Sequence, residues 1–180
     1  MVDAIGEDDV NQILSDFSCP KNEEIEFFVK NQALDFAKRK MSITHLVMDH
    51  EGNLAAIYTL THKALELGEE GLSETVKKKL KRFAQLDEKS NSYTVSAFLI
   101  AQFGKNQNCT ELSGVRLMEK AFETLSRVQR DVGGGVVYLE CEEKPKLLRF
   151  YEGSENRFRR FNERYSDKDN TKYLQLFRFF

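Results

Sequence analysis

The chain has 180 residues, of which 41% are hydrophobic and 31% are charged, and its formal net charge is −2. This near-neutral balance gives no global basic field of the kind that draws a protein to nucleic acid. No apolar run approaches the roughly 20 residues that span a bilayer, and the acidic N-terminus MVDAIGEDDV lacks a signal-peptide pattern, so we expect a cytoplasmic protein without membrane association.

Two helices and a β-hairpin are predicted in the first third of the chain. Residues 7–17 carry apolar side chains on one side of a short helix. Asn22 is suited to cap a second helix, whose apolar residues recur at steps of three and four from Ile25 to Ala37. Ile43–Met48 and Leu54–Thr61 have strand patterns and flank the turn Glu51-Gly52-Asn53, which predicts a hairpin.

The polar stretch over residues 65–91 has a weaker pattern. Ser73 is predicted to cap a helix whose apolar side consists of Val76, Leu80 and Phe83. The other side has the sequence KKKLKR. We interpret this basic run as a solvated helix face, and a patch that contacts RNA is the alternative.

Strands and helices alternate in the second half of the chain. Val95–Phe103 is predicted as a strand. The helix after it presents one apolar face (Val115, Met118, Phe122, Leu125 and Val128), and Gly133-Gly134-Gly135 ends it. Val136–Cys141 is the next strand, and Lys172–Phe180 is the last one.

A further helix is predicted between these last two strands. Pro145 fits its first turn, and Leu147, Leu148 and Tyr151 lie on one face. Strand–helix–strand alternation predicts a parallel strand pair, whereas the early hairpin is antiparallel. The expected fold class is therefore α/β with a central mixed sheet, helices on both faces, and one domain over residues 1–180.

The cysteines and histidines do not predict a metal site. Cys19, Cys109 and Cys141 are widely spaced without a CxxC motif, and the three histidines lack HExxH spacing. We expect no bound metal and free thiols, which fit a reducing compartment.

Four stretches resemble, in order, the GNAT superfamily of acetyl-CoA-dependent N-acetyltransferases, and in particular its toxin–antitoxin branch. They are Phe17–Ala37, Thr44–Thr61, Phe98–Phe122 and Val136–Glu152. The third is similar to the cofactor strand, pyrophosphate loop and following helix. The superfamily's loop pattern, Arg/Gln-x-x-Gly-x-Gly/Ala, is matched only at Gly114, and Glu111 adds a negative charge where phosphate would lie.

The resemblance implies acetyl-CoA as the acyl donor and assigns residues to it. The pantetheine arm would lie along the strand edge near Ile100, at Ala101, Gln102 and Phe103. The pyrophosphate would lie at the start of the next helix, where free N–H groups and the helix dipole favour an anion. The residues there are Ser113, Gly114 and Val115. Taken alone, the Ser-Gly turn favours a simple capped helix instead.

Tyr151 matches the GNAT tyrosine that protonates the leaving thiolate. An unperturbed phenol has a pKa of about 10 and is therefore protonated at neutral pH. The alternative is that its ring only packs under the sheet. No general base is evident, since the acidic run at Glu140, Glu142 and Glu143 is also typical of a solvated strand end.

The function that the resemblance implies is acetyl transfer to a primary amine, such as the amino group of aminoacyl-tRNA. The segment Lys77–Arg82 would then meet RNA phosphates together with Arg157, Arg159, Arg160 and Arg164. A homodimer and an antitoxin partner are also implied. The alternative is a non-catalytic binding or regulatory protein on a degenerate GNAT fold.

Overall fold

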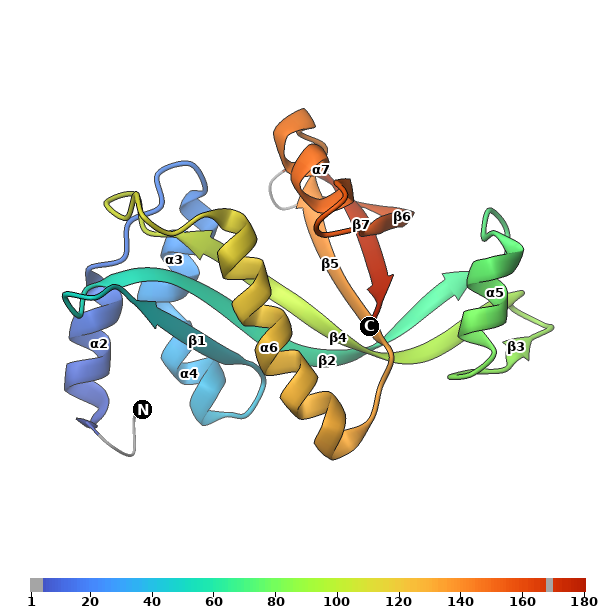
Figure 1. The fold of residues 1–180 in the computed structure, drawn as a ribbon, viewed down its shortest axis with the longest axis horizontal. Helices are drawn as coiled ribbons and strands as arrows, with labels where there is room; N and C mark the ends of the chain where they lie inside the picture. Colours follow the sequence, from blue (N-terminus) through green and yellow to red (C-terminus); the bar gives the residue numbers. More distant parts are fainter. Residues whose placement is uncertain (1–4, 168–169) are drawn as a thin grey trace. The chain divides into compact units, whose positions relative to one another are not determined.

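The structure, a computed structural model, describes residues 5–167 and 170–180 (Figure 1). Within them a seven-stranded sheet has the order β1-β2-β4-β5-β7-β6, with β3 paired to β4. The strands are β1 Ile43–Met48, β2 Leu54–Gly68, β3 Leu86–Asp87, β4 Ser92–Lys105, β5 Val136–Glu142, β6 Arg159–Ser166 and β7 Thr171–Phe179. The helices are α2 Glu7–Ser15, α3 Glu23–Asn31, α4 Ala33–Lys38, α5 Glu74–Leu80, α6 Gly114–Val132 and α7 Pro145–Glu152.

The chain divides into two compact units. The first comprises Met1–Thr61 and Ile100–Phe122, and the second comprises His62–Leu99 and Glu123–Phe180. The elements β2, β4 and α6 each contribute residues to both units. The predicted α/β class with a mixed sheet is confirmed, whereas the single domain over residues 1–180 stays a prediction.

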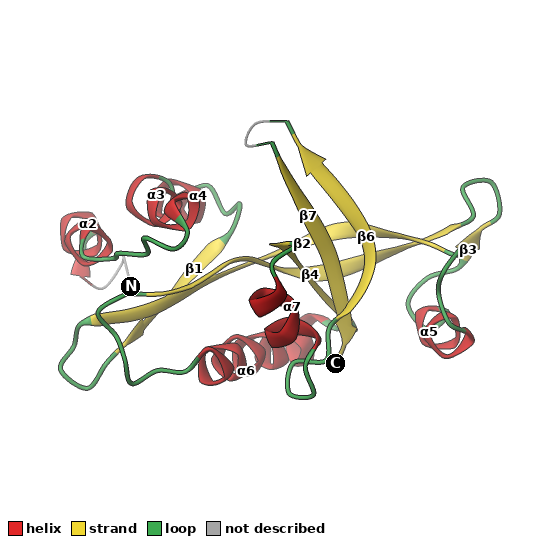
Figure 2. Cartoon of the chain, turned by 90° about the horizontal axis from the view of Figure 1, so that it is seen from above, coloured by secondary structure: helices red, strands yellow, loops and turns green. Residues whose placement is uncertain are grey.

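In the first unit, helices cover both faces of the strands. The helices α2, α3 and α4 lie on one face, and the first half of α6 lies on the other (Figure 2). The first three bury apolar side chains against β2, and this core consists of Val10, Leu14, Phe17, Phe28, Val29, Ala33, Leu54 and Ile57. The predicted apolar side of residues 7–17 is therefore largely the buried side.

The second predicted helix is interrupted. Asn22 caps it as expected, because its Oδ1 accepts the Ile25 N–H at 3.1 Å. The helix ends at Asn31, however, and Gln32 has a φ of −128°, so that α4 starts anew at Ala33. One continuous helix to Ala37 was therefore a wrong prediction, since an apolar spacing of three and four does not report a local break.

The predicted hairpin is confirmed. The strands β1 and β2 pair antiparallel from Ile43 opposite Leu60 onward. Asp49 closes the turn, since its Oδ1 accepts the N–H groups of Glu51 at 3.0 Å and Asn53 at 2.8 Å. β2 continues to Gly68, beyond the predicted end at Thr61.

The second unit contains the predicted parallel pair. Phe98 and Leu99 of β4 lie opposite Val137 and Tyr138 of β5. β5 then pairs antiparallel with β7, which pairs antiparallel with β6. The strand β6 was not predicted. The core of the second unit includes Leu65, Leu67, Val76, Leu80, Tyr93, Val95, Ala97, Val136, Tyr138 and Phe177.

Two predicted apolar faces need correction. Ser73 caps α5 and both Val76 and Leu80 are buried, but the helix ends at Leu80, so Phe83 lies outside it and is 47% exposed. In α6 the buried residues include Leu117, Met118, Ala121 and Leu125, whereas Val128 is 37% exposed. The buried face of α6 is therefore rotated relative to the predicted one. The helix ends at Val132, directly before the glycine run that was predicted to end it.

Tyr93 carries a buried hydroxyl that leads to the first testable prediction. Its side chain is fully buried, and its Oη has no hydrogen-bond partner within the described part of the chain. An unsatisfied buried polar group destabilises the fold. We expect Tyr93→Phe to raise the free energy of unfolding by up to about 1 kcal/mol, measured by urea denaturation. A loss of stability would show that the hydroxyl has a partner, such as a buried water.

Candidate functional site

The last part of β4 extends beyond its ladder with β5. That ladder consists of the pairs Phe98–Val137 and Leu99–Tyr138, and β4 continues from Ile100 to Lys105. Ala101 in this stretch is exposed, and Gln102 and Phe103 are half-buried. A strand edge of this kind can hydrogen-bond an extended ligand as an added strand would. The residues predicted to hold pantetheine thus lie on a suitable segment.

Asn106 anchors the loop that follows β4. Its side chain is buried, and its Nδ2 donates to the carbonyl oxygens of Asp16 at 3.0 Å and Leu54 at 2.9 Å. Its backbone N–H donates to the Ala55 carbonyl at 2.9 Å. One residue therefore joins the end of α2, the start of β2 and the loop before α6, all within the first unit.

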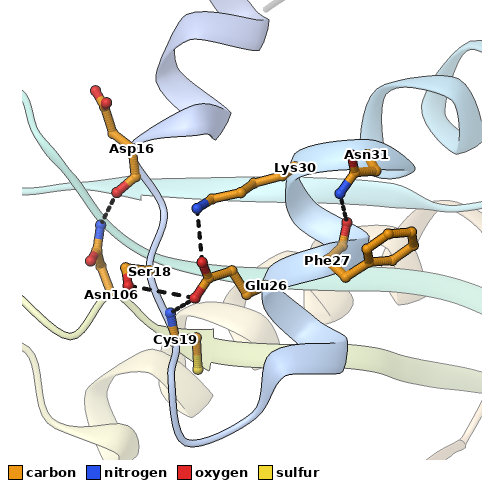
Figure 3. A network of polar contacts seen from close by, with 8 residues as sticks. All are labelled: Asp16, Ser18, Cys19, Glu26, Phe27, Lys30, Asn31 and Asn106. Carbon is orange, nitrogen blue, oxygen red and sulfur yellow. Dashed lines mark hydrogen bonds and ion pairs between the residues drawn. The ribbon is translucent and has the colours of Figure 1, made fainter.

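A second set of contacts supports the same loop (Figure 3). Glu26 of α3 accepts the Cys19 N–H at 2.6 Å and contacts the Lys30 ammonium at 2.8 Å. The segment held in this way contains Ser18, whose carbonyl accepts the N–H of Gln107 at 2.8 Å. The hydrogen bond from Lys30, followed by that from the Cys19 backbone, lowers the pKa of Glu26. The ionised carboxylate is thus the form that the fold favours.

This predicts a pH-dependent contribution of Glu26 to stability. Because the folded-state pKa is lowered, the contribution is fully present above the ordinary value of 4.5 and disappears as the pH falls through the folded-state pKa. We expect wild type to be more stable than Glu26→Gln at pH 7, with the difference vanishing in acid. Urea unfolding from pH 7 to pH 3 measures it, with the exposed Glu123→Gln as control. A difference independent of pH would contradict the role of the charge.

The start of α6 is both a capped helix and a candidate anion site. Ser113 Oγ accepts the Arg116 N–H at 3.2 Å, and the Ser113 carbonyl accepts the Leu117 N–H at 3.1 Å. The first N–H groups of a helix, here those of Gly114 and Val115, have no acceptor inside the helix. They lie at the positive end of the helix dipole. The cap predicted as the simple alternative is therefore present, and it leaves these two donors for a ligand.

Two charged residues beside this turn change the electrostatic picture that the sequence suggested. Glu111 lies 3.4 Å from His50 Nδ1, so its carboxylate is directed toward the hairpin turn. Lys105, at the end of β4, donates from Nζ to the Leu112 carbonyl just before Ser113. Sequence reasoning missed Lys105, although a basic residue that ends a strand before such a loop was a usable signal.

Tyr151 belongs to the second unit and is 7% exposed on α7. Its ring packs edge-on against Phe150 and Phe158, with centroids 4.9 and 6.1 Å away. Burial, assisted by the nearby Cys141, raises the pKa of the Tyr151 phenol well above its ordinary value. The hydroxyl therefore stays protonated at any ordinary pH. The six predicted cofactor residues lie in the first unit, and the catalytic one lies in the second.

The acidic and basic groups proposed as base or RNA contacts are largely paired. Glu140 binds Arg164 at 2.8 Å, and Glu152 binds Arg160 at 2.7 Å. Glu142 pairs with Lys144, and Glu143 pairs with Lys172.

In the described ranges no group of three or more His, Cys, Asp or Glu side chains could hold a metal. The three cysteines are free.

No described helix has the length and apolar character needed to cross a membrane.

Comparison with protein-family models found no match, and a search of curated proteins found none either. Solved structures do match, and they show the fold: the chain has the fold of the GNAT-type toxins AtaT and KacT.

The particular neighbours include three complexes or variants of such toxins. AtaT complexed with acetyl-methionyl-tRNAfMet is 15% identical, covers 93% of this chain and 86% of its own, and has a TM-score of 0.65. A tyrosine-to-phenylalanine mutant of KacT is 16% identical over 92% and 86%, with a TM-score of 0.64. A similar mutant of AtaT, bound to the C-terminus of the antitoxin AtaR and acetyl-CoA, is 12% identical over 92% and 84%, with a TM-score of 0.59.

Proposed function

We propose that this protein is an N-acetyltransferase that moves the acetyl group of acetyl-CoA to a primary amine. The observation that carries the proposal is the continuous run from the extended end of β4, through an anchored loop, to the two free N–H donors at the start of α6. The shared fold supports it, since a neighbour with that fold was solved with acetyl-CoA.

Acetyl-CoA would bind along this run. The pantetheine amides would hydrogen-bond to the β4 edge from Ile100 through Ala101 and Gln102 to Phe103. The diphosphate would accept hydrogen bonds at Ser113, Gly114 and Val115, where the helix dipole favours an anion. A backbone N–H of β4 would also stabilise the oxyanion that forms on the thioester carbonyl.

The chemistry needs one acid from the protein. The amine nitrogen attacks the thioester carbonyl carbon, the C–N bond forms and the C–S bond breaks. The thiolate takes the proton of the Tyr151 hydroxyl, and the proton released by the amine goes to water and restores the phenol. Burial raises the pKa of the Tyr151 phenol, so its hydroxyl keeps the proton that this step needs at neutral pH.

An aminoacyl-tRNA amine is the acceptor we propose, by analogy with the AtaT complex. Of the basic residues on and after α5, Lys78, Lys81 and Arg82 are exposed and suited to phosphate contacts. Lys77 is held by Glu69 and Glu74. We also propose that the protein acts in the cytoplasm as a single functional domain. We propose further that it forms a homodimer and binds an antitoxin.

Release of CoA thiol, followed with the purified protein and a panel of acceptors, tests the function. The panel would contain charged tRNAs, polyamines and peptide N-termini, with uncharged tRNA as the matched control. Transfer to charged tRNA alone would support the proposed acceptor. Binding of acetyl-CoA without turnover on any acceptor would instead favour a non-catalytic regulatory protein, the alternative suggested by the degenerate loop.

A further inference from the structure

The loop between β4 and α6 lacks the cation or amide that begins the GNAT pyrophosphate pattern, because Cys109 stands there. The structure brings another cation to this loop. Lys105 is half-buried, and its Nζ donates to the carbonyl of Leu112, which directly precedes Ser113. Its backbone is held in place by the next residue, the buried anchor Asn106.

Within the part of the chain that the structure describes, no carboxylate forms an ion pair with Lys105. The nearest acidic residue of the loop in sequence, Glu111, lies 3.4 Å from His50 Nδ1 and not against Lys105. An ammonium has three N–H donors, and the Leu112 carbonyl uses one of them. Two donors and a full positive charge therefore remain beside the N-terminal end of α6.

We infer that Lys105 binds the diphosphate of acetyl-CoA and supplies the cation that the loop itself lacks. This inference rests on the proposed function and names a binding residue that the family pattern does not contain. A half-buried ammonium and a diphosphate attract each other more strongly than two exposed charges would, because the surrounding dielectric is lower. The hydrogen bond to the Leu112 carbonyl holds the ammonium one residue before Ser113, where the turn that would hold the ligand begins.

The competing explanation is that Lys105 only ties the loop to the strand, and variants separate the two roles. Lys105→Gln keeps a donor for the Leu112 carbonyl and removes the charge. Lys105→Arg keeps the charge. Lys120→Gln removes an exposed lysine from α6 and serves as the matched control. Thermal unfolding confirms that each variant is folded.

Calorimetric titration with acetyl-CoA at several salt concentrations provides the test. Lys105→Gln loses one charged hydrogen bond to phosphate, and its affinity for acetyl-CoA is therefore expected to be about 10- to 100-fold lower than that of wild type. The affinity of the variant should also depend less on salt concentration. The acetyl-CoA affinity of Lys105→Arg should stay within about threefold of wild type, because the positive charge is kept. The affinity of Lys120→Gln should equal that of wild type, because Lys120 does not contact the diphosphate.

Affinity for acetyl-pantetheine, which lacks the diphosphate, should be equal in wild type and Lys105→Gln. Equal acetyl-CoA affinity in wild type and Lys105→Gln would overturn the inference and leave the proposed function standing. Equal weakening for both ligands would also overturn it, because it would assign Lys105 a purely structural role. No binding of acetyl-CoA by wild type would overturn the proposed function and this inference together.

Discussion

Replacing Tyr151 with phenylalanine is expected to lower kcat by about 10²–10⁴-fold, the usual contribution of a general acid. The acetyl-CoA affinity should change by less than about threefold, because the hydroxyl acts only on the leaving thiolate. The ring would keep its contacts with Phe150 and Phe158, so the fold should tolerate the change. Single-turnover kinetics with calorimetry on the same samples separate the two effects.

The pH profile gives an independent check on Tyr151. Burial raises the pKa of its phenol above 10, so the proton-donating form persists throughout the neutral and mildly alkaline range. Ionisation of Tyr151 should therefore not lower the wild-type kcat between pH 7 and pH 9.5. The pH profiles of wild type and Tyr151→Phe should have the same shape over this range. Tyr93→Phe, which removes a buried hydroxyl elsewhere in the second unit, is the matched control and should keep full activity. Unchanged turnover in Tyr151→Phe would remove the acid role.

Asn106→Asp is expected to destabilise the protein by about 2–4 kcal/mol. The variant loses the Nδ2 donor to both carbonyls: the buried Leu54 carbonyl left without a partner costs about 1–3 kcal/mol, and the part-buried hydrogen bond to the Asp16 carbonyl adds about 1 kcal/mol. It also places a carboxylate beside two carbonyl oxygens, which repels them. Urea unfolding at pH 7 measures the loss in the free energy of unfolding.

The loop that Asn106 anchors should also lose its order. Acetyl-CoA affinity is therefore expected to fall in Asn106→Asp even at temperatures where the protein is folded. Asn108→Asp, a nearby exposed position of the same loop, makes the same chemical change without a buried partner and should leave the free energy of unfolding nearly unchanged. A stable Asn106→Asp variant would show that other contacts, such as that of Gln107 with Ser18, are sufficient to hold the loop.

The features that the sequence predicted well are those set by neighbouring residues. Asn22, Ser73 and Ser113 cap helices because an oxygen one residue before a helix reaches its free N–H groups. The hairpin at Asp49 follows from local turn chemistry in the same way. These interactions need no knowledge of the rest of the chain.

The features that were missed depend on distant partners. β6 has the sequence RRFNERYS and is largely exposed, so no apolar alternation marks it, and its pairing with β7 alone makes it a strand. The contacts of Asn106 with Asp16 and Leu54 join segments far apart in sequence. The bond from Lys105 to Leu112 depends on the path of the loop, which no periodicity encodes.

Calorimetric titration of the purified protein with acetyl-CoA, with CoA as the matched ligand, tests the central claim most directly. The proposed site predicts micromolar binding of both, since the β4 edge and the start of α6 contact parts that the two ligands share. Binding that is absent at millimolar ligand would contradict it. The turn at Ser113-Gly114 would then be a helix cap alone, and a regulatory protein on a GNAT fold would be the better conclusion.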